Sequence, residues 1–487
     1  MDNQFIGRKE EREILQDALD SREAELVSVI GRRRVGKTFL VESFYEEKIV
    51  FQVSGIQHTP LAGQLRNFTA QLTKFVKKST PVPVGIKQHS DWFDAILSLI
   101  AYLETVVGKE RKVVFFDELP WLAKRKSGFL QAFSYFWNSW ASKQNLVVVI
   151  CGSAASWMIQ KVVKNRGGLH NRITKRIHMK PFTLAETEQY LRSRNMDFDH
   201  YEILHFYMAM GGVPHYLKEI KKGRSVVQNI DRICFSDSGL LRDEFSELYA
   251  ALFDHADNHI AVIRALAKKR MGLPRTEIIK AAKLPNGGGV TKVLEELEQS
   301  GFISSYYPFG KKKKERLYRL TDEYSLFYLQ FIENKRNEGA GTWQHLSQTP
   351  AYKTWSGYAF ESICLKHIPQ IKKALGIAGV YTLSSAFYKK GIPMAIGKEK
   401  GLQIDLVLDR NDHVINLFEI KFYNEPYTLS KAYAARLREK QGIFRKATKT
   451  RKRLSWAMIT TFGLKKNQHS LGIVEADLTM DVLFEEV

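Results

Sequence analysis

The sequence predicts a multidomain α/β protein, and three observations predict it. The first is an apolar strand that runs directly into a glycine-containing loop and a helix, over residues 26–43. The second is a run of helices followed by two short strands, over residues 255–321. The third is a pair of alternating strands that carry charged residues, over residues 401–424. They predict an N-terminal parallel sheet, a largely helical middle and a separate C-terminal α/β region.

The composition is that of a packed and strongly basic protein. The chain has 487 residues, of which 44% are hydrophobic, and 74 Lys+Arg stand against 52 Asp+Glu, giving a net charge of +22. At roughly 100–200 residues per domain, this length predicts about two to four domains. The hydrophobic share excludes a mostly disordered chain. The positive charge favours a polyanionic partner, nucleic acid first, and a general solubility charge is the alternative.

Cysteine usage and hydropathy predict a cytoplasmic location. The three cysteines, Cys151, Cys234 and Cys364, are too few for a disulfide framework and are typical of reduced thiols. The first residues are polar and of mixed charge, without the apolar centre of a signal peptide. No stretch reaches the roughly 18 uninterrupted apolar residues of a membrane span. We therefore expect no membrane association.

Residues 26–43, LVSVIGRRRVGKTFLVES, predict a phosphate-binding loop between a strand and a helix. The segment from Gly31 to Thr38 fits G-x-x-x-x-G-K-[ST]. In such a loop backbone N–H groups surround the phosphates, and the N-terminus of the following helix adds a favourable dipole. Lys37 would reach the β- and γ-phosphates, and Thr38 would hold Mg²⁺. The expected nucleotide-binding residues are Gly31, Arg32, Arg33, Arg34, Val35, Gly36, Lys37, Thr38 and Phe39.

Two further apolar strands end in polar residues that suit phosphoryl transfer. KVVFFDELPW (112–121) leads to Asp117, which would hold the metal's water shell, and Glu118, which would orient or deprotonate the attacking water. The alternative for this pair is the cap of a helix. LVVVICGS (146–153) places Ser153 where it could sense the γ-phosphate, although a tight turn would also need a small side chain. Arg172 in the basic loop 167–176 could neutralise transition-state charge in cis or in trans, or be ordinary surface charge.

This part of the chain resembles the archaeal-type ATPases of the AAA+/STAND branch of P-loop NTPases. The resemblance implies a P-loop ATPase core over residues 1–183, a helical lid over 184–250, and ATP with Mg²⁺ as the cofactor. It further implies that Phe5, Ile6, Gly7 and Arg8 lie against the adenine and that Pro214 belongs to a sensor near the nucleotide. From the residues alone, the GGVP segment is a helix terminator. The segments that carry the resemblance are FIGRKEE (5–11), GRRRVGKT (31–38), FFDELPWL (115–122), CGSAASWM (151–158), LHNRITKRIHMKPFT (169–183) and MGGVPHYL (210–217).

Residues 251–333 have the element order of a winged helix. Three helical patterns are followed by two short strands that flank GKKKKE. The third helix would read DNA, and Lys311–Lys314 would form the tip of the wing. Glu295, Glu296 and Glu298 on that helix are unfavourable next to phosphate, so an interdomain or protein-binding spacer is the alternative. Residues 334–356 are less periodic and contain Gly, Pro and Ser, and we expect a linker there.

The stretch GLQIDLVLDRNDHVINLFEIKFYN (401–424) predicts a β-hairpin that carries a charged constellation. Asp405 lies on the first strand, and Glu419 and Lys421 share one face of the second because they are two residues apart. Two carboxylates can hold Mg²⁺ or Mn²⁺, and a lysine can activate water and stabilise charge on phosphate. The alternative is a surface hairpin with ordinary charges. Apolar residues flank Glu419 and Lys421 on both sides, which argues against that alternative.

This hairpin resembles the site of the PD-(D/E)xK nuclease superfamily. The matching residues are Asp405, Glu419 and Lys421, which the resemblance implies are catalytic, with the two acids as metal ligands. In that superfamily an earlier helix often contributes a further acid, and the helical segment 357–371 offers Glu361. The resemblance implies a restriction-endonuclease-like α/β domain over residues 357–487.

Residues 431–453, KAYAARLREKQGIFRKATKTRKR, predict a basic helix after this hairpin. The segment holds ten Lys/Arg and one Glu, and its apolar positions have helical spacing. A basic face beside a phosphodiesterase site suits a nucleic-acid backbone. Because aromatic residues are sparse in the segment, we expect phosphate contacts rather than base stacking. A solvated surface helix is the alternative.

These features together predict an ATP-hydrolysing protein whose nucleotide state gates a Mg²⁺-dependent nuclease, with DNA as the partner. The domain order resembles prokaryotic ATPases that pair this core with a C-terminal nuclease-like domain. One alternative is a non-cleaving, ATP-dependent regulator in which the C-terminal fold only binds DNA or a partner. Another is an oligomeric motor, in which Arg172 would act on the neighbouring copy of a homo-oligomer.

Overall fold

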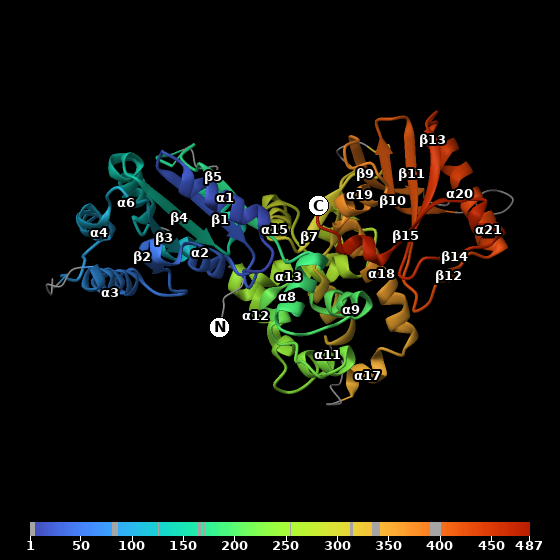
Figure 1. Ribbon diagram of the computed structural model, residues 1–487, viewed down its shortest axis with the longest axis horizontal. Helices are drawn as coiled ribbons and strands as arrows, with labels where there is room; N and C mark the ends of the chain where they lie inside the picture. Colours follow the sequence, from blue (N-terminus) through green and yellow to red (C-terminus); the bar gives the residue numbers. More distant parts are fainter. Residues whose placement is uncertain are drawn as a thin grey trace. The chain divides into compact units, whose positions relative to one another are not determined.

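Two structural units make up the chain. The structure is a computed structural model that describes residues 5–79, 86–124, 126–163, 167–169, 171–253, 255–311, 315–333, 341–389 and 401–487. The first unit comprises Met1–Pro181 with Ala251–Asp254, and the second comprises Phe182–Ala250 with His255–Val487 (Figure 1). No helix in the described ranges is long and apolar enough to cross a membrane.

A five-stranded parallel sheet forms the centre of the first unit. The strand order is β2-β3-β4-β1-β5, so the strand before the phosphate loop lies between β4 and β5. Strands β1 and β4 are buried along their whole length, as their unbroken apolar runs predict for a sheet covered on both faces. The strands are β1 (Glu25–Gly31), β2 (Ile49–Ser54), β3 (Lys112–Asp117), β4 (Leu146–Gly152) and β5 (Lys175–Met179).

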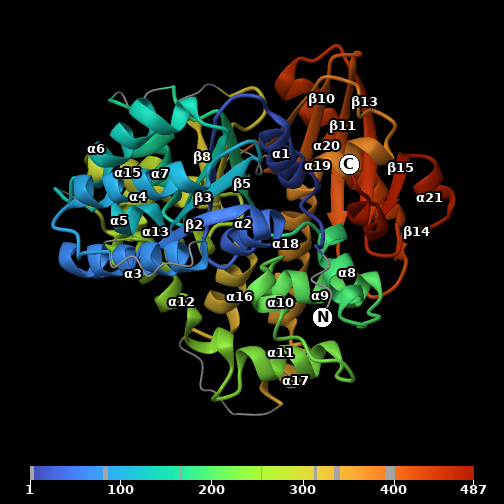
Figure 2. The same cartoon turned by 60° about the vertical axis from the view of Figure 1, so that its left-hand side comes forward.

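Helices cover both faces of this sheet (Figures 1 and 2). One hydrophobic cluster joins the sheet to α1 and α2, and a second, rich in phenylalanine, joins it to α3, α4 and α6. The parallel α/β fold expected for a P-loop NTPase is therefore confirmed for this unit. The helices are α1 (Lys9–Asp20), α2 (Lys37–Tyr45), α3 (Leu61–Ser79), α4 (Trp92–Val106), α5 (Leu119–Leu122), α6 (Phe129–Tyr135) and α7 (Ala155–Met158).

The second unit begins with helices. Three of them open with side-chain caps at Thr183, Asp199 and Ser225, each in a capping box. The helices of this stretch are α8 (Leu184–Ser193), α9 (His200–Met210), α10 (Pro214–Leu217), α11 (Val226–Cys234) and α12 (Leu240–Leu252).

Three helices and a three-stranded antiparallel sheet follow. The strand order is β6-β8-β7, with Ile303 of β7 opposite Leu320 of β8. Lys312 to Lys314 of the expected wing tip lie outside the described residues. The elements are α13 (Ala256–Ala267), β6 (Leu273–Pro274), α14 (Arg275–Ala282), α15 (Gly288–Gln299), β7 (Ile303–Tyr306), β8 (Leu317–Leu320) and α16 (Glu323–Phe331).

The expected linker over residues 334–356 differs from the structure where the structure describes it. Residues from 341 onward form α17 (Thr342–Leu346) and the start of α18 (Pro350–Lys366). Trp343 and Trp355 are both buried, and their rings contact Phe327 and Phe331 of α16 at centroid distances of 4.9–5.6 Å. Burial of these indole rings orders a segment that has little periodicity in its sequence.

A mixed five-stranded sheet of order β15-β13-β11-β10-β9 ends the chain. Strands β9, β10 and β11 are antiparallel neighbours, whereas β11, β13 and β15 run parallel. Helix α18 packs near β11, and α20 places Ala434, Leu437 and Phe444 in the core of this sheet. The elements are α19 (Ile368–Ala374), β9 (Thr382–Lys389), β10 (Leu402–Arg410), β11 (Val414–Lys421), β12 (Tyr427–Thr428), α20 (Lys431–Thr448), β13 (Arg453–Thr460), β14 (Leu464–Lys465), α21 (Gln468–Leu471) and β15 (Val474–Thr479).

The close approach at Gly212 yields a stability prediction. Gly212 accepts a hydrogen bond from Phe182 N at 2.6 Å, and a Cβ on Gly212 would lie 2.0 Å from Phe182 O. Gly212→Ala should therefore lower the free energy of unfolding by about 1–3 kcal/mol, because backbone must move. Gly289→Ala in α15, where a Cβ meets nothing within 4 Å, should raise it by about 0.4–1 kcal/mol. Thermal unfolding of the two variants checks both signs, and equal midpoints would contradict the close approach.

Candidate functional site

The expected phosphate loop joins β1 to α2 with left-handed backbone at two residues. Arg34 has φ 73° and Gly36, the N-cap of α2, has φ 90°. Glycine adopts this conformation without steric cost, which accounts for the second glycine of the motif. Gly31 lies so close to β5 that a Cβ would be 2.5 Å from Met179 O. The loop therefore brings a run of backbone N–H groups to the N-terminus of a helix, as a phosphate site requires.

The side chain of Lys37 is hydrogen-bonded to the backbone of this loop. Its side chain is 5% exposed and Nζ donates to Arg32 O at 2.9 Å. A lysine held across the loop by a backbone carbonyl is placed to exchange that bond for phosphate oxygens. Val35 is buried, Arg33 is half-buried and Phe39 is exposed on α2.

Asp117, at the carboxyl end of β3, accepts hydrogen bonds from two hydroxyl groups. Thr38 Oγ1 donates to Asp117 Oδ2 at 2.9 Å, and Ser54 Oγ donates to the same oxygen at 2.8 Å. The carboxylate is 4% exposed, and its hydrogen-bond donors here are neutral groups. A hydroxyl and a buried carboxylate side by side are hard oxygen ligands, so Thr38 and Asp117 fit Mg²⁺. Sequence reasoning missed Ser54, although it is a small polar residue at the end of β2.

Glu118 and Ser153 meet at the same edge of the sheet. Ser153 Oγ donates to Glu118 Oε2 at 2.7 Å, and Ser153 N donates to it at 3.2 Å. Glu118 has φ 47°, an uncommon backbone conformation for a residue with a side chain. The structure therefore brings together two residues that the sequence placed on separate strands.

The N-terminal segment is tied to the loop through Arg8. Its guanidinium donates from Nη1 to Lys180 O at 2.8 Å and from Nη2 to Val35 O at 3.2 Å. The Phe5 ring lies 5.8 Å from the Phe39 ring on α2. Gly7 and Arg8 both have left-handed backbone, with Ile6 preceding them. These contacts bring the predicted adenine-binding segment beside the phosphate loop.

Arg172 and Pro214 are the two further residues predicted for the nucleotide site. Arg172 is exposed, in the turn that precedes β5. Pro214 opens α10 in the second unit, after Gly211 and Gly212. Their roles towards the nucleotide stay predictions.

In the second unit, Asp405 and Glu419 lie on neighbouring antiparallel strands. Leu406 of β10 pairs with Phe418 of β11, so Asp405 and Glu419 are the next residues along that register. Glu419 is 4% exposed. Lys421 Nζ donates to Glu419 Oε1 at 2.6 Å, and Lys440 Nζ of α20 donates to Oε2 at 2.8 Å. The hydroxyl of Tyr433 also donates to Glu419 Oε1.

These groups line a cavity of about 1150 Å³ in the second unit. Its charged lining includes Asp405, Glu419, Lys421 and Lys440, together with Arg270 from the turn before β6 and Arg436 of α20. Sequence reasoning missed Arg270, Tyr433 and Lys440. Tyr433 and Lys440 are seven residues apart and therefore share one helix face, a spacing that could have revealed them.

Part of the expected basic face of α20 lines the cavity. Of the lysines and arginines in this helix, Arg436 and Lys440 line the cavity. Arg453, just beyond the helix, pairs with Glu475 at 2.6 Å, and Lys452 pairs with Asp409 at 2.6 Å. Packing of Ala434, Leu437 and Phe444 decides which face of the helix turns towards the site.

The pKa values of the carboxylates at this site are shifted in opposite directions. Burial alone would raise the pKa of Glu419, but Lys421 and Lys440 lower that pKa to about 2. Burial, and then the charge of Glu419, raise the pKa of Asp405. Burial, and then the charge of Asp405, raise the pKa of Glu361 to about 7, although Arg270 and Arg319 oppose the shift. A divalent cation near Asp405 would relieve this repulsion.

The expected three-acid metal site is not assembled. Among the described residues, no group of three or more His, Cys, Asp and Glu side chains could hold a metal ion. The reason is that Glu361 is paired with Arg270, Nη2 to Oε2 at 2.6 Å, and Glu419 with the two lysines. Asp405 and Glu419 remain a two-carboxylate arrangement that fits a hard cation once the lysines yield.

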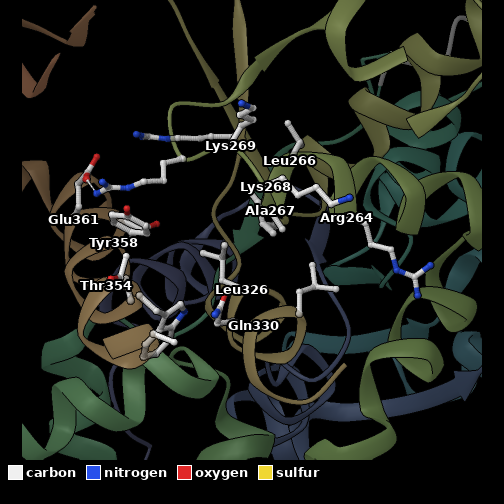
Figure 3. Close-up of a pocket in the computed structure, with 18 of the residues that line it drawn as sticks. Arg264, Leu266, Ala267, Lys268, Lys269, Leu326, Gln330, Thr354, Tyr358 and Glu361 are labelled. Carbon is white, nitrogen blue, oxygen red and sulfur yellow. Dashed lines mark hydrogen bonds and ion pairs between the residues drawn. The ribbon is translucent and has the colours of Figure 1, made fainter. Parts of the chain in front are cut away.

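A second cavity of about 1120 Å³ adjoins this one on the other side of α18. Figure 3 shows Glu361, Tyr358 and Thr354 on one side of it and Lys268 and Lys269 on the other. Arg270, Thr354 and Tyr358 line both cavities. The guanidinium carbon of Arg270 lies 2.9 Å from the centroid of the Tyr358 ring. Arg270 therefore connects the three-helix segment to the C-terminal sheet.

The raised pKa of Glu361 predicts a pH-dependent stability. The folded chain holds this proton up to about pH 7, against a pKa of about 4.3 in an unfolded chain. The protonated Glu361 carboxyl contributes fully to the free energy of unfolding below its pKa in the unfolded chain. This contribution is lost as the pH rises through 7. In EDTA, the wild-type melting temperature should therefore fall relative to that of Glu361→Gln between pH 5 and pH 8, which thermal melts measure. Glu425→Gln, at an exposed carboxylate, is the control, and a parallel wild-type and Glu361→Gln profile would contradict the prediction.

The chain is similar to several known proteins. Residues 5–220 match the family described as the ATPase domain predominantly from Archaea. The uncharacterised protein MJECL04 of Methanocaldococcus jannaschii is 23% identical over 86% of this chain and 87% of its own length. The Walker-type ATPase PABY2304 of Pyrococcus abyssi covers 67% of this chain and 96% of its own, with 19% identity and a TM-score of 0.46. The ORC1 protein of Aeropyrum pernix in complex with DNA covers 66% and 90%, with 16% identity and a TM-score of 0.31.

The matched segment contains the phosphate loop, Asp117, Glu118 and Ser153, and it ends just beyond Pro214. These residues are where an ATP-hydrolysing domain needs phosphate-binding, metal-binding and water-orienting groups. The match of residues 5–220 to this ATPase domain supports the binding and hydrolysis of ATP by this part of the chain.

Proposed function

We propose that this protein is an ATP-driven, metal-dependent nuclease, in which the nucleotide state gates cleavage of DNA. The observation that carries the proposal is the meeting of Asp405, Glu419 and Lys421 in one large cavity, in a chain that also has an ATPase domain. Two acids and a lysine around a space open to an extended ligand are the parts that phosphodiester hydrolysis needs. The net charge of +22 favours a polyanionic substrate.

In the ATPase domain, we assign each polar group one task. Lys37 binds the β- and γ-phosphates after leaving Arg32 O, and Thr38 with Asp117 holds Mg²⁺. Glu118 orients the attacking water, and Ser153, which donates to Glu118, reports whether the γ-phosphate is present. Phe5, Ile6, Gly7 and Arg8 flank the adenine. The hydrogen bond between Ser153 and Glu118 supports this assignment, because a change at either residue moves the other.

In the C-terminal region, Asp405 and Glu419 hold Mg²⁺ or Mn²⁺. Lys421 then activates water and stabilises the charge on the phosphate. Lys440 and Tyr433 donate hydrogen bonds to Glu419 in the structure, and a bound metal would replace these bonds. Because a cation and the two lysines would compete for one carboxylate, metal binding at Glu419 would be coupled to release of the lysines.

Residues 251–333 are proposed as a winged helix. The support is the order of three helices and an antiparallel β-hairpin. The acidic residues of α15 are less unfavourable than the sequence suggested, because Glu296 pairs with His259 at 2.8 Å and Glu298 with Arg316 at 2.7 Å. Phe309, after β7, donates from N to Ala386 O at 2.8 Å and contacts Phe444. These contacts also support the alternative role of a spacer.

A non-cleaving, ATP-dependent regulator is the second candidate. The observation that favours it is the neutralised state of the site, where both oxygens of Glu419 accept from lysines and Glu361 pairs with Arg270. In such a protein the cavity would bind nucleic acid or a partner without cutting. An exposed Arg172 also suits action on a neighbouring copy in a homo-oligomer.

Removal of the Asp405 charge separates the two candidates. Asp405→Asn should lower Mg²⁺- or Mn²⁺-dependent DNA cleavage by about 100-fold or more, because a metal ligand is lost, and should leave ATP turnover unchanged. Asp409→Asn, on the same strand but paired with Lys452, should cleave like wild type. Cleavage of single- and double-stranded DNA with and without ATP measures both effects. Absence of cleavage by wild type under all these conditions would favour the regulator.

Removal of the Lys37 charge tests the ATPase assignment. Lys37→Ala should lower ATP turnover by about 100-fold or more, since a positive group aimed at the transferred phosphoryl is lost. Lys48→Ala, at an exposed lysine beyond the same helix, should hydrolyse ATP like wild type. Phosphate release measures the rate, and circular dichroism checks that both variants fold. Equal turnover by the two variants would show that the loop does not bind the triphosphate.

A further inference from the structure

Tyrosines surround the cavity that holds Asp405 and Glu419. Five line it, and three of these, Tyr358, Tyr388 and Tyr423, keep 37–43% of their surface exposed. Exposed aromatic rings around a charged centre are unusual on a surface that binds nothing. Large and flat side chains at a cavity edge indicate a ligand with flat faces.

The three exposed tyrosines come from three separate elements. Tyr388 of β9 pairs with Gln403 of β10, two residues before Asp405. Tyr423 follows Lys421 by two residues, at the end of β11. Tyr358 precedes Glu361 by about one turn of α18. They therefore reach the cavity of the carboxylate–lysine centre from three elements.

Cationic side chains lie beside three of the five tyrosine rings. Lys353 Nζ lies 6.0 Å from the Tyr423 ring centroid, and Arg270 lies over Tyr358. Arg436 lies 5.9 Å from the ring of Tyr433. A polynucleotide offers a phosphate and a base at each step, so cations and aromatic rings in one cavity suit such a ligand.

A smaller cavity of about 400 Å³ adjoins the first and shares Lys353, Phe422 and Tyr423 with it. Its other walls include Tyr201, His205 and Tyr352, and the rings of Tyr201 and Phe422 lie parallel to within 12° at 5.7 Å. Burial lowers the pKa of His205 to about 4, so this wall is neutral at physiological pH. A neutral, aromatic-walled space of this size suits a single flat ring system such as a nucleobase.

We propose that these two cavities form one binding surface for a single nucleic-acid strand, with bases on Tyr388 and Tyr423 and phosphates on Lys353, Arg270 and Arg436. A single strand exposes its base faces, whereas a duplex hides them in its own stack. The larger cavity exceeds the roughly 300–1,000 Å³ of a small-molecule pocket, which also favours an extended ligand. The inference rests on the proposed nucleic-acid function of this site and names its substrate class.

This proposal differs from the expectation of phosphate contacts without base stacking. That expectation rested on the few aromatic residues within residues 431–453. The tyrosines of the surface come instead from α18, from β9 and from the segment after β11. Packing of the helices against the sheet brings these tyrosines together around the site.

Binding in EDTA without ATP tests the surface apart from any cleavage. The probe is a labelled oligonucleotide of mixed sequence, used as a single strand and after annealing to its complement, with fluorescence anisotropy as the readout. The single strand should bind more tightly than the duplex. Tyr388→Ala and Tyr423→Ala should each weaken single-strand binding by about 5- to 100-fold, because one stacking platform is lost.

Two controls separate stacking from a general loss of structure. Tyr388→Phe should bind like wild type, since the ring remains. Tyr381→Ala, at a 70%-exposed tyrosine that does not line the cavity, should also bind like wild type. Circular dichroism and the thermal unfolding midpoint of each variant check that it folds. Duplex binding as tight as single-strand binding, or Tyr388→Ala and Tyr423→Ala binding like Tyr381→Ala, would overturn the proposal. Failure of wild type to cleave would count against the nuclease alone and leave this result standing.

Discussion

The ion pairs around Glu419 are the constraint on which the C-terminal region depends. A buried carboxylate is costly unless charges and hydrogen bonds compensate it, and Lys421 and Lys440 supply the charges. Lys421 follows from the two-residue period of β11, but Lys440 requires α20 to lie across the sheet with a fixed rotation. That rotation is the one at which Ala434, Leu437 and Phe444 are buried. The ion pair between Lys440 and Glu419 and the burial of these three apolar residues therefore require the same position of α20 on the sheet.

Two buried carboxylates in this chain are satisfied in different ways, and the difference bears on function. Asp117 accepts from the hydroxyls of Thr38 and Ser54, which leave its negative charge in place for a cation. Glu419 accepts from two ammonium groups, which cancel its charge. A metal at the first carboxylate displaces only hydrogen bonds, whereas a metal at the second must displace ion pairs. In the proposed function, a metal would therefore bind readily at Asp117, whereas binding at Glu419 would first require the lysines to pair with other anions. A phosphate backbone supplies such anions, so substrate and metal would favour each other's binding.

Local patterns predicted part of this structure, and tertiary packing decided the remainder. The phosphate loop and the β10–β11 hairpin depend on neighbouring residues, so alternation and motif spacing were enough to predict them. Lys440, Tyr433 and Arg270 approach the site from elements distant in sequence, and no local pattern positions them. Residues 341–356 resembled a linker because their helical period is weak, but Trp343 and Trp355 find their partners on α16. The basic residues after β12 were counted correctly, yet only core packing shows that Arg436 and Lys440 are the ones that face the cavity.

Arg270 makes the three-helix segment part of the C-terminal site. It belongs to the turn between α13 and β6, yet it pairs with Glu361 and lines the cavity of Asp405. Phe309, at the other end of the same small sheet, is hydrogen-bonded to β9 and packed against Phe444. Two contacts at opposite ends of one small sheet mean that a rotation of residues 255–321 cannot leave the cavity unchanged. If Arg270 moved away, the burial of Glu361 would lose its compensating charge, and the carboxylate would take up a proton or a metal ion instead. A movement of this segment would therefore change the charge beside Asp405. The proposed metal binding at Asp405 depends on that charge.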